Sequence, residues 1–323
     1  MFFQVLTNKR SKLLLVPAAI FILATVACFT VENSGPNPEV SAQWLHLVPG
    51  QPTAPRTDFV LPDVVTLCGE TIPLNRPAVR DKLEFEFLLA VHHKAQVELW
   101  LRRAQRYFPL IEAALKQAGL PDDLKYLAVA ESDLRPSVAS PAGALGLWQF
   151  MPATARQFGL TVSSHVDQRH LPEQLLNAGI KYLTSLKNKF GSWSLAMAAY
   201  NAGDGRIHQA VTSQNTKDYY ELDLVTETSR YVYRIAALKI VLENAAQYGF
   251  ELSPEPDLWR PIEFEEVKLT FSEPVSWAAL ARKQGCDYKT LRLLNPHLSA
   301  MPVLKGGPFW LRLPPNQKPV LGT

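Results

Sequence analysis

The chain has 323 residues, which is enough for one sizeable domain and a smaller one. Its 47% hydrophobic and 20% charged residues are typical of a folded protein and argue against long disordered regions. The formal net charge is only +3, and no basic run is interleaved with aromatic residues, so nucleic acid is not expected as a partner.

The N-terminus carries the features of an export signal. A basic stretch, residues 9–12, precedes an uncharged apolar run that extends to Val31. The run is also long enough for an uncleaved membrane anchor. A third alternative is lipidation, because the sequence ending at Cys28 resembles a bacterial lipobox. Residues 1–31 are therefore predicted to be a signal peptide or a membrane or lipid anchor.

The next segment is rich in proline and lacks periodicity. Residues 32–61 are predicted to be an extended linker. Residues 62–80 are more apolar, and we expect an irregular segment that packs on the domain after it.

The cysteines offer no firm disulfide. Cys68 lies in residues 62–80 and Cys286 lies in the tail, so the two could pair only if separate modules dock. Free thiols are an equal alternative, and no metal-ligand spacing links the cysteines, so neither metal nor cofactor is expected.

Helical periodicity dominates from residue 81 onward. An apolar face that includes Phe87 and Val91 begins a long helical stretch, and a second helix near Leu110 ends at Gly119. Short Gly/Pro turns separate the helices, which is typical of a mainly α domain, predicted here over residues 62–252. The further helices expected are 121–134, 154–158, 172–190, 194–200 and 227–248.

One of these helices places a carboxylate on its apolar face. Leu124, Leu127, Ala128 and Glu131 follow i, i+3, i+4, i+7 spacing, which turns all four toward the core. A charged group is costly to bury, so Glu131 needs a partner or a catalytic task. A structural glutamate held by an arginine or by backbone donors is the alternative, and the helix alone favours it.

Two later segments have the composition of a ligand-binding surface. Residues 139–152 contain two glycines three apart within an apolar and aromatic run, so they could wall a cleft with Trp148, Phe150 or Met151, and with Gln149 as a polar contact. A core hairpin is the equal alternative. The sequence then places Tyr200 and Asn201 at a Gly-rich turn, which suits either ligand contact or a plain helix end.

In the C-terminal tail, the sequence pattern changes from helical periodicity to alternation. Residues 267–271 and 309–313 alternate between apolar and polar, as strands do, and two short helices with capping residues lie between them. A strand–helix–helix–strand order predicts a small separate module over residues 263–314.

Four motifs in order resemble those of the lytic transglycosylase family. They are Glu131-Ser132, the Gly-Ala-Leu-Gly-Leu-Trp-Gln-Phe-Met-Pro run of 143–152 with Thr154-Ala155, the Ala-Tyr-Asn-Ala-Gly run of 199–203, and Glu227-Thr-x-x-Tyr231-Val. The resemblance implies a lysozyme-like catalytic domain of the goose-type/transglycosylase kind, most similar to the membrane-bound lytic murein transglycosylase D type. The βααβ tail resembles a divergent LysM module.

The resemblance also implies a reaction. The substrate would be peptidoglycan, cut between N-acetylmuramic acid and N-acetylglucosamine without water and leaving 1,6-anhydro ends. Glu131 would be the general acid and then the base, with its pKa raised by its apolar neighbours. Asp133 would point to the opposite side of the helix and could not be the second carboxylate of a pair. The resemblance implies substrate-assisted chemistry, for which one carboxylate suffices, and a second carboxylate from a distant part of the chain is the alternative.

The substrate-binding residues implied by the resemblance are spread over all the motifs. Ser140 would lie near the N-acetyl group and Tyr200 would orient the acid, and the cleft would be completed by Gln149, Met151, Asn201, Glu227 and Tyr231. The protein would be an anchored monomer on the periplasmic face of a bacterial envelope, with glycan strands and the membrane as its partners. A water-using muramidase and a non-catalytic peptidoglycan-binding protein are the alternatives.

Overall fold

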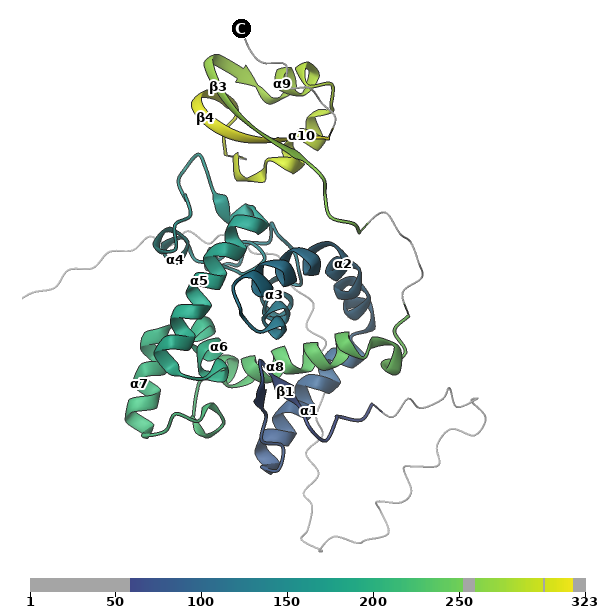
Figure 1. Cartoon of the computed structure of the whole chain (residues 1–323), viewed down its shortest axis with the longest axis vertical. Helices are drawn as coiled ribbons and strands as arrows, with labels where there is room; N and C mark the ends of the chain where they lie inside the picture. Colours follow the sequence, from purple (N-terminus) through teal and green to yellow (C-terminus); the bar gives the residue numbers. More distant parts are fainter. Residues whose placement is uncertain (1–58, 252–258, 299, 316–323) are drawn as a thin grey trace, which may run out of the picture. The chain divides into compact units, whose positions relative to one another are not determined.

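A computed structural model describes residues 59–251, 259–298 and 300–315 (Figure 1). The predicted anchor, residues 1–31, and nearly all of the predicted linker lie outside the described residues. Among the helices in the described ranges, none is both long and apolar enough to cross a membrane.

The described chain begins with a small hairpin that sequence periodicity did not reveal. Strand β1 (Thr66–Leu67) pairs antiparallel with β2 (Glu70–Thr71), and the turn between them places Cys68 at a positive φ of 53°. The expected packing of this segment on the domain is confirmed, because Leu67 and Ile72 are buried in the main core. Two-residue strands are too short to produce a visible alternation, which explains the omission.

The first long helical stretch divides at a different place from the one predicted. Helix α1 (Pro77–His92) ends at His93, and α2 (Lys94–Gln117) continues through Pro109 without a break. The prediction of a second helix starting near Leu110 was therefore wrong. The turn at His93 lets both helices bury apolar residues in one core. In α2, this burial outweighs the loss of the backbone hydrogen bond that Pro109 cannot donate.

The helix that carries Glu131 is confirmed. After the 3₁₀ turn η2 (Asp122–Leu124), α3 (Lys125–Ser132) buries Leu127 and Ala128 completely. The helix stops because Asp133 takes a left-handed conformation with φ of 55°.

Helix α8 (Thr226–Glu243) is the centre of the helical domain and packs against α1, α3 and α6 (Figure 1). Helix α7 was not predicted, because its start at Gly203 was interpreted as the end of a Gly-rich turn and its polar sequence buries only Ile207. The remaining elements of the domain are η3 (Gln168–His170), η4 (Tyr219–Glu221), η5 (Ala245–Tyr248), α4 (Pro152–Gln157), α5 (Pro172–Phe190), α6 (Trp193–Ala202) and α7 (Asp204–Gln214).

The C-terminal module has the predicted strand–helix–helix–strand order. Strands β3 (Glu265–Ser276) and β4 (Val303–Leu313) are antiparallel, with Val267 opposite Leu311. Trp277 and Leu304 belong to a separate apolar core, distinct from that of the helical domain. The elements between the strands are α9 (Trp277–Lys283), α10 (Tyr288–Leu294) and η6 (Pro296–Leu298). Cys68 and Cys286 are both free thiols, so the alternative of a disulfide between the modules is not realised.

Candidate active site

Glu131 lies in the last turn of α3 and faces α8. The Tyr231 hydroxyl of α8 donates a hydrogen bond to Glu131 Oε1. Burial raises the pKa of Glu131 to about 7, the Tyr231 hydrogen bond and the charge of Arg234 oppose that rise, and the charge of Glu227 adds to it. The structural alternative, a glutamate held by an arginine or by backbone donors, is not what is found: the hydrogen-bond partner is a neutral hydroxyl.

A carboxyl with a pKa near 7 is suited to proton transfer in both directions. Close to neutral pH both of its protonation states are populated, so one group can donate a proton and later accept one. An ordinary glutamate, ionised almost completely at neutral pH, would be a poor acid. The apolar face of α3 therefore gives Glu131 acid–base capacity by desolvation, as the sequence predicted.

The segment after α3 is attached directly to the end of that helix. Ser132 Oγ donates to the carbonyl oxygens of Leu147 (2.9 Å) and Ala128 (3.1 Å). Gly146 has φ of +88°, and a Cβ there would lie 2.3 Å from the Arg169 carbonyl oxygen. Only glycine fits this position, which explains the second glycine of the motif.

Arg169 clamps this segment, a role that was not predicted from the sequence. Its side chain is buried at 7% exposure, and its guanidinium donates to the carbonyl oxygens of Gly143 (2.8 Å) and Phe150 (2.9 Å). Asp167 Oδ2 accepts from the same guanidinium at 2.7 Å, which offsets the cost of the buried charge. The one sequence signal, an acidic residue two positions before the arginine, does not indicate the distant carbonyls.

The structure divides the predicted cleft residues of this segment into two groups. Trp148 and Phe150 are fully buried in the core, so their predicted role as cleft walls was wrong and the core-hairpin alternative holds for them. Met151 is 42% exposed and is free to contact a ligand. Gln149 Nε2 donates to the carbonyl oxygens of Val138 and Gly146 at 2.9 Å each.

Ser140 also has a local structural contact. Its Oγ accepts a hydrogen bond from the Ala144 N–H at 3.0 Å, and the Ser140 N–H donates to the Ala144 carbonyl oxygen at 2.9 Å. The side chain closes the turn that contains Gly143. Ser140 and Gln149 therefore help to shape the segment, and contact of either one with a ligand stays a prediction.

Tyrosines from two helices lie near the carboxyl. The Tyr200 hydroxyl of α6 donates to the Trp148 carbonyl oxygen at 2.5 Å, and burial followed by the charge of Glu131 raises the pKa of Tyr200. The tyrosine that donates to the acid directly is Tyr231, whereas the resemblance implied that Tyr200 would orient the acid. Asn201 Oδ1 accepts from the Thr228 hydroxyl at 2.9 Å, which joins α6 to α8.

The two other carboxylates of the motifs have different surroundings. Glu227 is exposed in the first turn of α8, one turn before Tyr231. Asp133 Oδ1 accepts from the Trp100 indole N–H at 2.9 Å, and its Oδ2 pairs with Arg135. The structure thus brings together Glu131, Tyr200, Tyr231 and Glu227, and it holds Asp133 in other contacts.

The comparisons with known proteins agree with this arrangement. Residues 108–222 match the family described as Transglycosylase SLT domain. The match contains Glu131, the glycine-rich segment and the Tyr200 motif, so the predicted resemblance to this family is confirmed over these residues. Helix α8, with Glu227 and Tyr231, begins after the matched range.

Several relatives are transglycosylases by name. The chain is 28% identical to the membrane-bound lytic murein transglycosylase D of Escherichia coli K12 over 78% of its own length and 56% of the relative's. It is 33% identical to the soluble lytic murein transglycosylase of the same strain over 43% of this chain and 22% of that one. The chain therefore spans little more than half the length of the first of these relatives.

The 70 kDa soluble lytic transglycosylase of Escherichia coli is 26% identical, with a TM-score of 0.40, and the match covers 55% of this chain and 32% of that one.

Proposed function

We propose that the protein is a lytic transglycosylase that cleaves the β-1,4 bond between N-acetylmuramic acid and N-acetylglucosamine of peptidoglycan. The observation that carries the proposal is a single desolvated carboxyl, Glu131, with a pKa near 7 and a tyrosine hydroxyl on one oxygen. The SLT-family match and the names of the relatives support the choice of substrate.

The proposed reaction uses one proton relay and no water. Protonated Glu131 donates its proton to the glycosidic oxygen as the C1–O4 bond breaks. The C6 hydroxyl of the muramic acid then attacks C1 of the same sugar, and the Glu131 carboxylate accepts the hydroxyl proton. The products are a free 4-hydroxyl on N-acetylglucosamine and a 1,6-anhydromuramic acid end, and Glu131 is protonated again.

The test is a mass analysis of muropeptides released from purified sacculi. The expected products carry anhydro ends, lighter by one water than hydrolytic ends, and the Glu131→Gln variant should release almost none. Reducing ends in place of anhydro ends would overturn the transglycosylase proposal. Equal, minimal release by wild type and variant would favour the non-catalytic, peptidoglycan-binding alternative.

The muramidase alternative has one specific observation in its favour. Glu227 is close enough for its charge to raise the pKa of Glu131, so a second carboxylate is present to activate a water molecule. The alternative predicts reducing ends whose formation requires Glu227. The transglycosylase proposal predicts that Glu227→Gln changes the rate, while the products remain anhydro ends.

The finer features of the proposal concern the rest of the chain. The export signal or anchor of residues 1–31 would place the enzyme at the periplasmic face of the membrane, and the LysM-like module of residues 263–314 would hold it on glycan strands. The names of two groups of relatives, membrane-bound lytic murein transglycosylases D and C, support the membrane location. A monomer is expected, and sedimentation of the full chain would test that expectation.

A further inference from the structure

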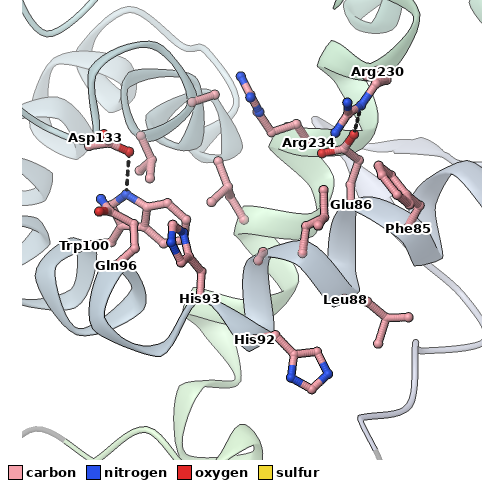
Figure 2. Close-up of a pocket in the computed structure, with 15 residues that line it drawn as sticks. Phe85, Glu86, Leu88, His92, His93, Gln96, Trp100, Asp133, Arg230 and Arg234 are labelled. Carbon is pink, nitrogen blue, oxygen red and sulfur yellow. Dashed lines mark hydrogen bonds and ion pairs between the residues drawn. The ribbon is translucent and has the colours of Figure 1, made fainter. Parts of the chain in front are cut away.

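Two polar pairs hold neighbouring helices together at a cavity of about 830 Å³ between α1, α2, α3 and α8, beside Glu131. Figure 2 shows Trp100 of α2 hydrogen-bonded to Asp133, the residue that ends α3. It also shows Arg230 of α8 paired with Glu86 of α1. These pairs fix α3 on α2 and α8 on α1. Neither of them sets α8 against α3, and that relation decides which side chain of α8 meets the acid.

Another contact joins α8 to the beginning of α3, at a distance from the acid. Lys239 of α8 donates to Asp123 Oδ2 at 2.8 Å, and Asp123 lies in η2, the turn that leads directly into α3. Asp123 is eight residues before Glu131, and Lys239 is eight residues after Tyr231. The Asp123–Lys239 and Glu131–Tyr231 contacts therefore share one antiparallel register, and about 12 Å of α8 separates them.

The Asp123–Lys239 pair is largely buried and is held by the β1–β2 hairpin. The two side chains are only 16% and 15% exposed. The Cys68 N–H donates to Asp123 Oδ2 at 2.7 Å, and Lys239 donates to the Thr66 carbonyl oxygen at 3.0 Å. The backbone of one hairpin thus bonds both members of the pair, which restricts where each of them can lie.

The hairpin itself is attached to the domain independently of this pair. Glu70 of β2 accepts hydrogen bonds from the first two N–H groups of α6, those of Trp193 at 2.5 Å and Ser194 at 3.0 Å. A carboxylate is favourable there, because it satisfies free N–H groups at the positive end of the helix. Leu67 and Ile72 of the hairpin segment are buried in the main core. The hairpin is therefore a fixed reference point for the pair.

Apolar packing between α3 and α8 does not set their register in the same way. The free energy of apolar burial is non-directional, so it changes little when one helix slides slightly along another. A hydrogen bond weakens steeply with distance and angle, so the Asp123–Lys239 pair opposes such a slide. The bond from Tyr231 to Glu131 depends on the same axial position of α8.

We propose that Asp123 and Lys239 are positioning residues of the active site, which set the register of α8 on α3 so that Tyr231 meets Glu131. The proposal rests on the proposed function, because Glu131 is the acid of that reaction. Lys239 and the hairpin lie outside residues 108–222, the range that matches the SLT family. The pair therefore joins the matched part of the chain to a helix that follows it.

A change of register would act on Glu131 mainly through Tyr231. The other groups that interact with Glu131 are Arg234, which lines the cavity, and Glu227, both on α8, and the buried Tyr200 of α6. Arg234 and Glu227 shift the pKa of Glu131 in opposite directions, and charge interactions change slowly with distance. The Tyr231 hydrogen bond, which lowers that pKa, is short-ranged. A loosened register should therefore raise the pKa of Glu131.

The experiment measures the titration of Glu131 in the full chain by NMR of isotope-labelled glutamate carboxyls. The signal that is missing from Glu131→Gln assigns the group. Lys239→Met keeps the apolar stem and removes the donor, so the midpoint should move upward by up to about one pH unit, the shift expected of Tyr231→Phe. The double variant Lys239→Met/Tyr231→Phe should titrate where Tyr231→Phe does, because the hydrogen bond is already absent.

Two further variants make the measurement specific. Asp123→Asn keeps an acceptor for the Cys68 N–H but loses the charge, so it should move the midpoint in the same direction by a smaller amount. Lys189→Met is the matched control, because Lys189 pairs with Asp204 at 2.6 Å and joins α5 to α7. It should leave the midpoint unchanged. A midpoint that neither Lys239→Met nor Asp123→Asn moves, or additive shifts in the double variant, would overturn the proposal.

Release of anhydro ends from sacculi by the same proteins separates this proposal from the proposed function. The alkaline limb of the rate should move together with the midpoint of Glu131. A midpoint that Lys239→Met moves, in a protein whose wild type releases no anhydro ends, would overturn the proposed function alone. Anhydro ends from wild type, with limb and midpoint unmoved in both pair variants, would overturn the positioning role alone.

Discussion

Glu131 and Tyr231 form the central contact of the candidate site, and they lie 100 residues apart in the sequence. The hydrogen bond favours the ionised carboxylate, whereas the apolar surroundings favour the neutral acid. The apolar surroundings favour the neutral acid more than the hydrogen bond favours the carboxylate, so the pKa is near 7. The activity and the stability of the protein should both depend on this one group.

The first prediction concerns the pH dependence of the rate. The acid step needs protonated Glu131, so the rate of anhydro-end release should fall as pH rises through about 7. Tyr231→Phe removes a hydrogen bond that lowers the pKa, so the alkaline limb should move upward by about one pH unit. Tyr233→Phe, on the same helix but without a contact to the acid, should leave the profile in place. An unchanged profile in Tyr231→Phe would contradict the assignment of Tyr231.

The second prediction concerns the stability cost of the acid. Folding raises the pKa of Glu131 from its ordinary 4.5 to about 7, so its contribution to stability is complete below pH 4.5 and is lost as pH rises through 7. At pH 8, Glu131→Gln should therefore raise the free energy of unfolding by on the order of 2 to 3 kcal/mol. Near pH 4 the two proteins should unfold at similar denaturant concentrations. A variant no more stable than wild type at pH 8 would show that neighbouring groups offset the cost of burying the ionised carboxylate.

At the scale of the elements, the segment between α3 and α4 depends on close backbone packing. Gly179 of α5 faces the Trp148 ring, and a Cβ there would lie 2.8 Å from it. The Trp148 carbonyl oxygen in turn accepts the hydrogen bond of Tyr200. A movement of this segment would therefore displace the Tyr200 hydroxyl and change the surroundings of Glu131.

The third prediction uses two helical glycines. Gly179→Ala should lower the free energy of unfolding by about 1 to 3 kcal/mol, because the methyl group overpacks the core at Trp148. Gly205→Ala in α7 is the control, since its Cβ would meet nothing within 4 Å. It should stabilise the protein by up to about 1 kcal/mol, the difference in helix propensity. Denaturant unfolding measures both, and equal stability of the two variants would contradict the overpacking.

The fourth prediction tests Arg169 as the clamp of the same segment. Arg169→Lys keeps the positive charge but cannot span Gly143, Phe150 and Asp167 with one planar group. Activity should fall about tenfold or more while the melting temperature falls only modestly, and proteolysis should become faster between residues 139 and 151. Arg156→Lys, an exposed arginine of α4, should change neither. Wild-type activity in Arg169→Lys would show that the segment holds its shape without the clamp.

At the scale of the whole molecule, the described part of the chain contains two separate apolar cores. The helical domain buries the surroundings of Glu131, and the C-terminal module has its own core around Trp277. Trp310 on β4 is 54% exposed, which is unusual for so large an apolar ring. An exposed indole suits stacking on a sugar face.

The fifth prediction follows for binding to sacculi. Trp310→Ala should weaken sedimentation with purified sacculi up to about tenfold, or about 1.4 kcal/mol. The rate on short soluble glycans should not change, because Glu131 and its neighbours, the proposed active site, belong to the helical domain. Tyr288→Ala, at the same 54% exposure on α10, is the control. Binding that survives Trp310→Ala at full strength would place glycan contact elsewhere on the module.

The sequence by itself determined the features that depend on local periodicity. It placed Glu131 on the buried face of α3, located α5 to the residue, and predicted the order of elements in the C-terminal module. Each of these features follows from the spacing of apolar residues within one element. The break at His93 and helix α7 were missed, because weak local signals there are overridden by packing.

The tertiary structure alone decided which side chains act together. Tyr231 is the residue bonded to Glu131, Arg169 clamps a segment about twenty residues before it, and Trp148 belongs to the core. The cavity with Arg234 is built from four helices. No rule of spacing connects such residues, because hydrogen bonds and desolvation depend on distance in space. The helix of Glu131 and the upward direction of its pKa shift could therefore be predicted from the sequence, but the size of that shift and the partners of the carboxyl could not.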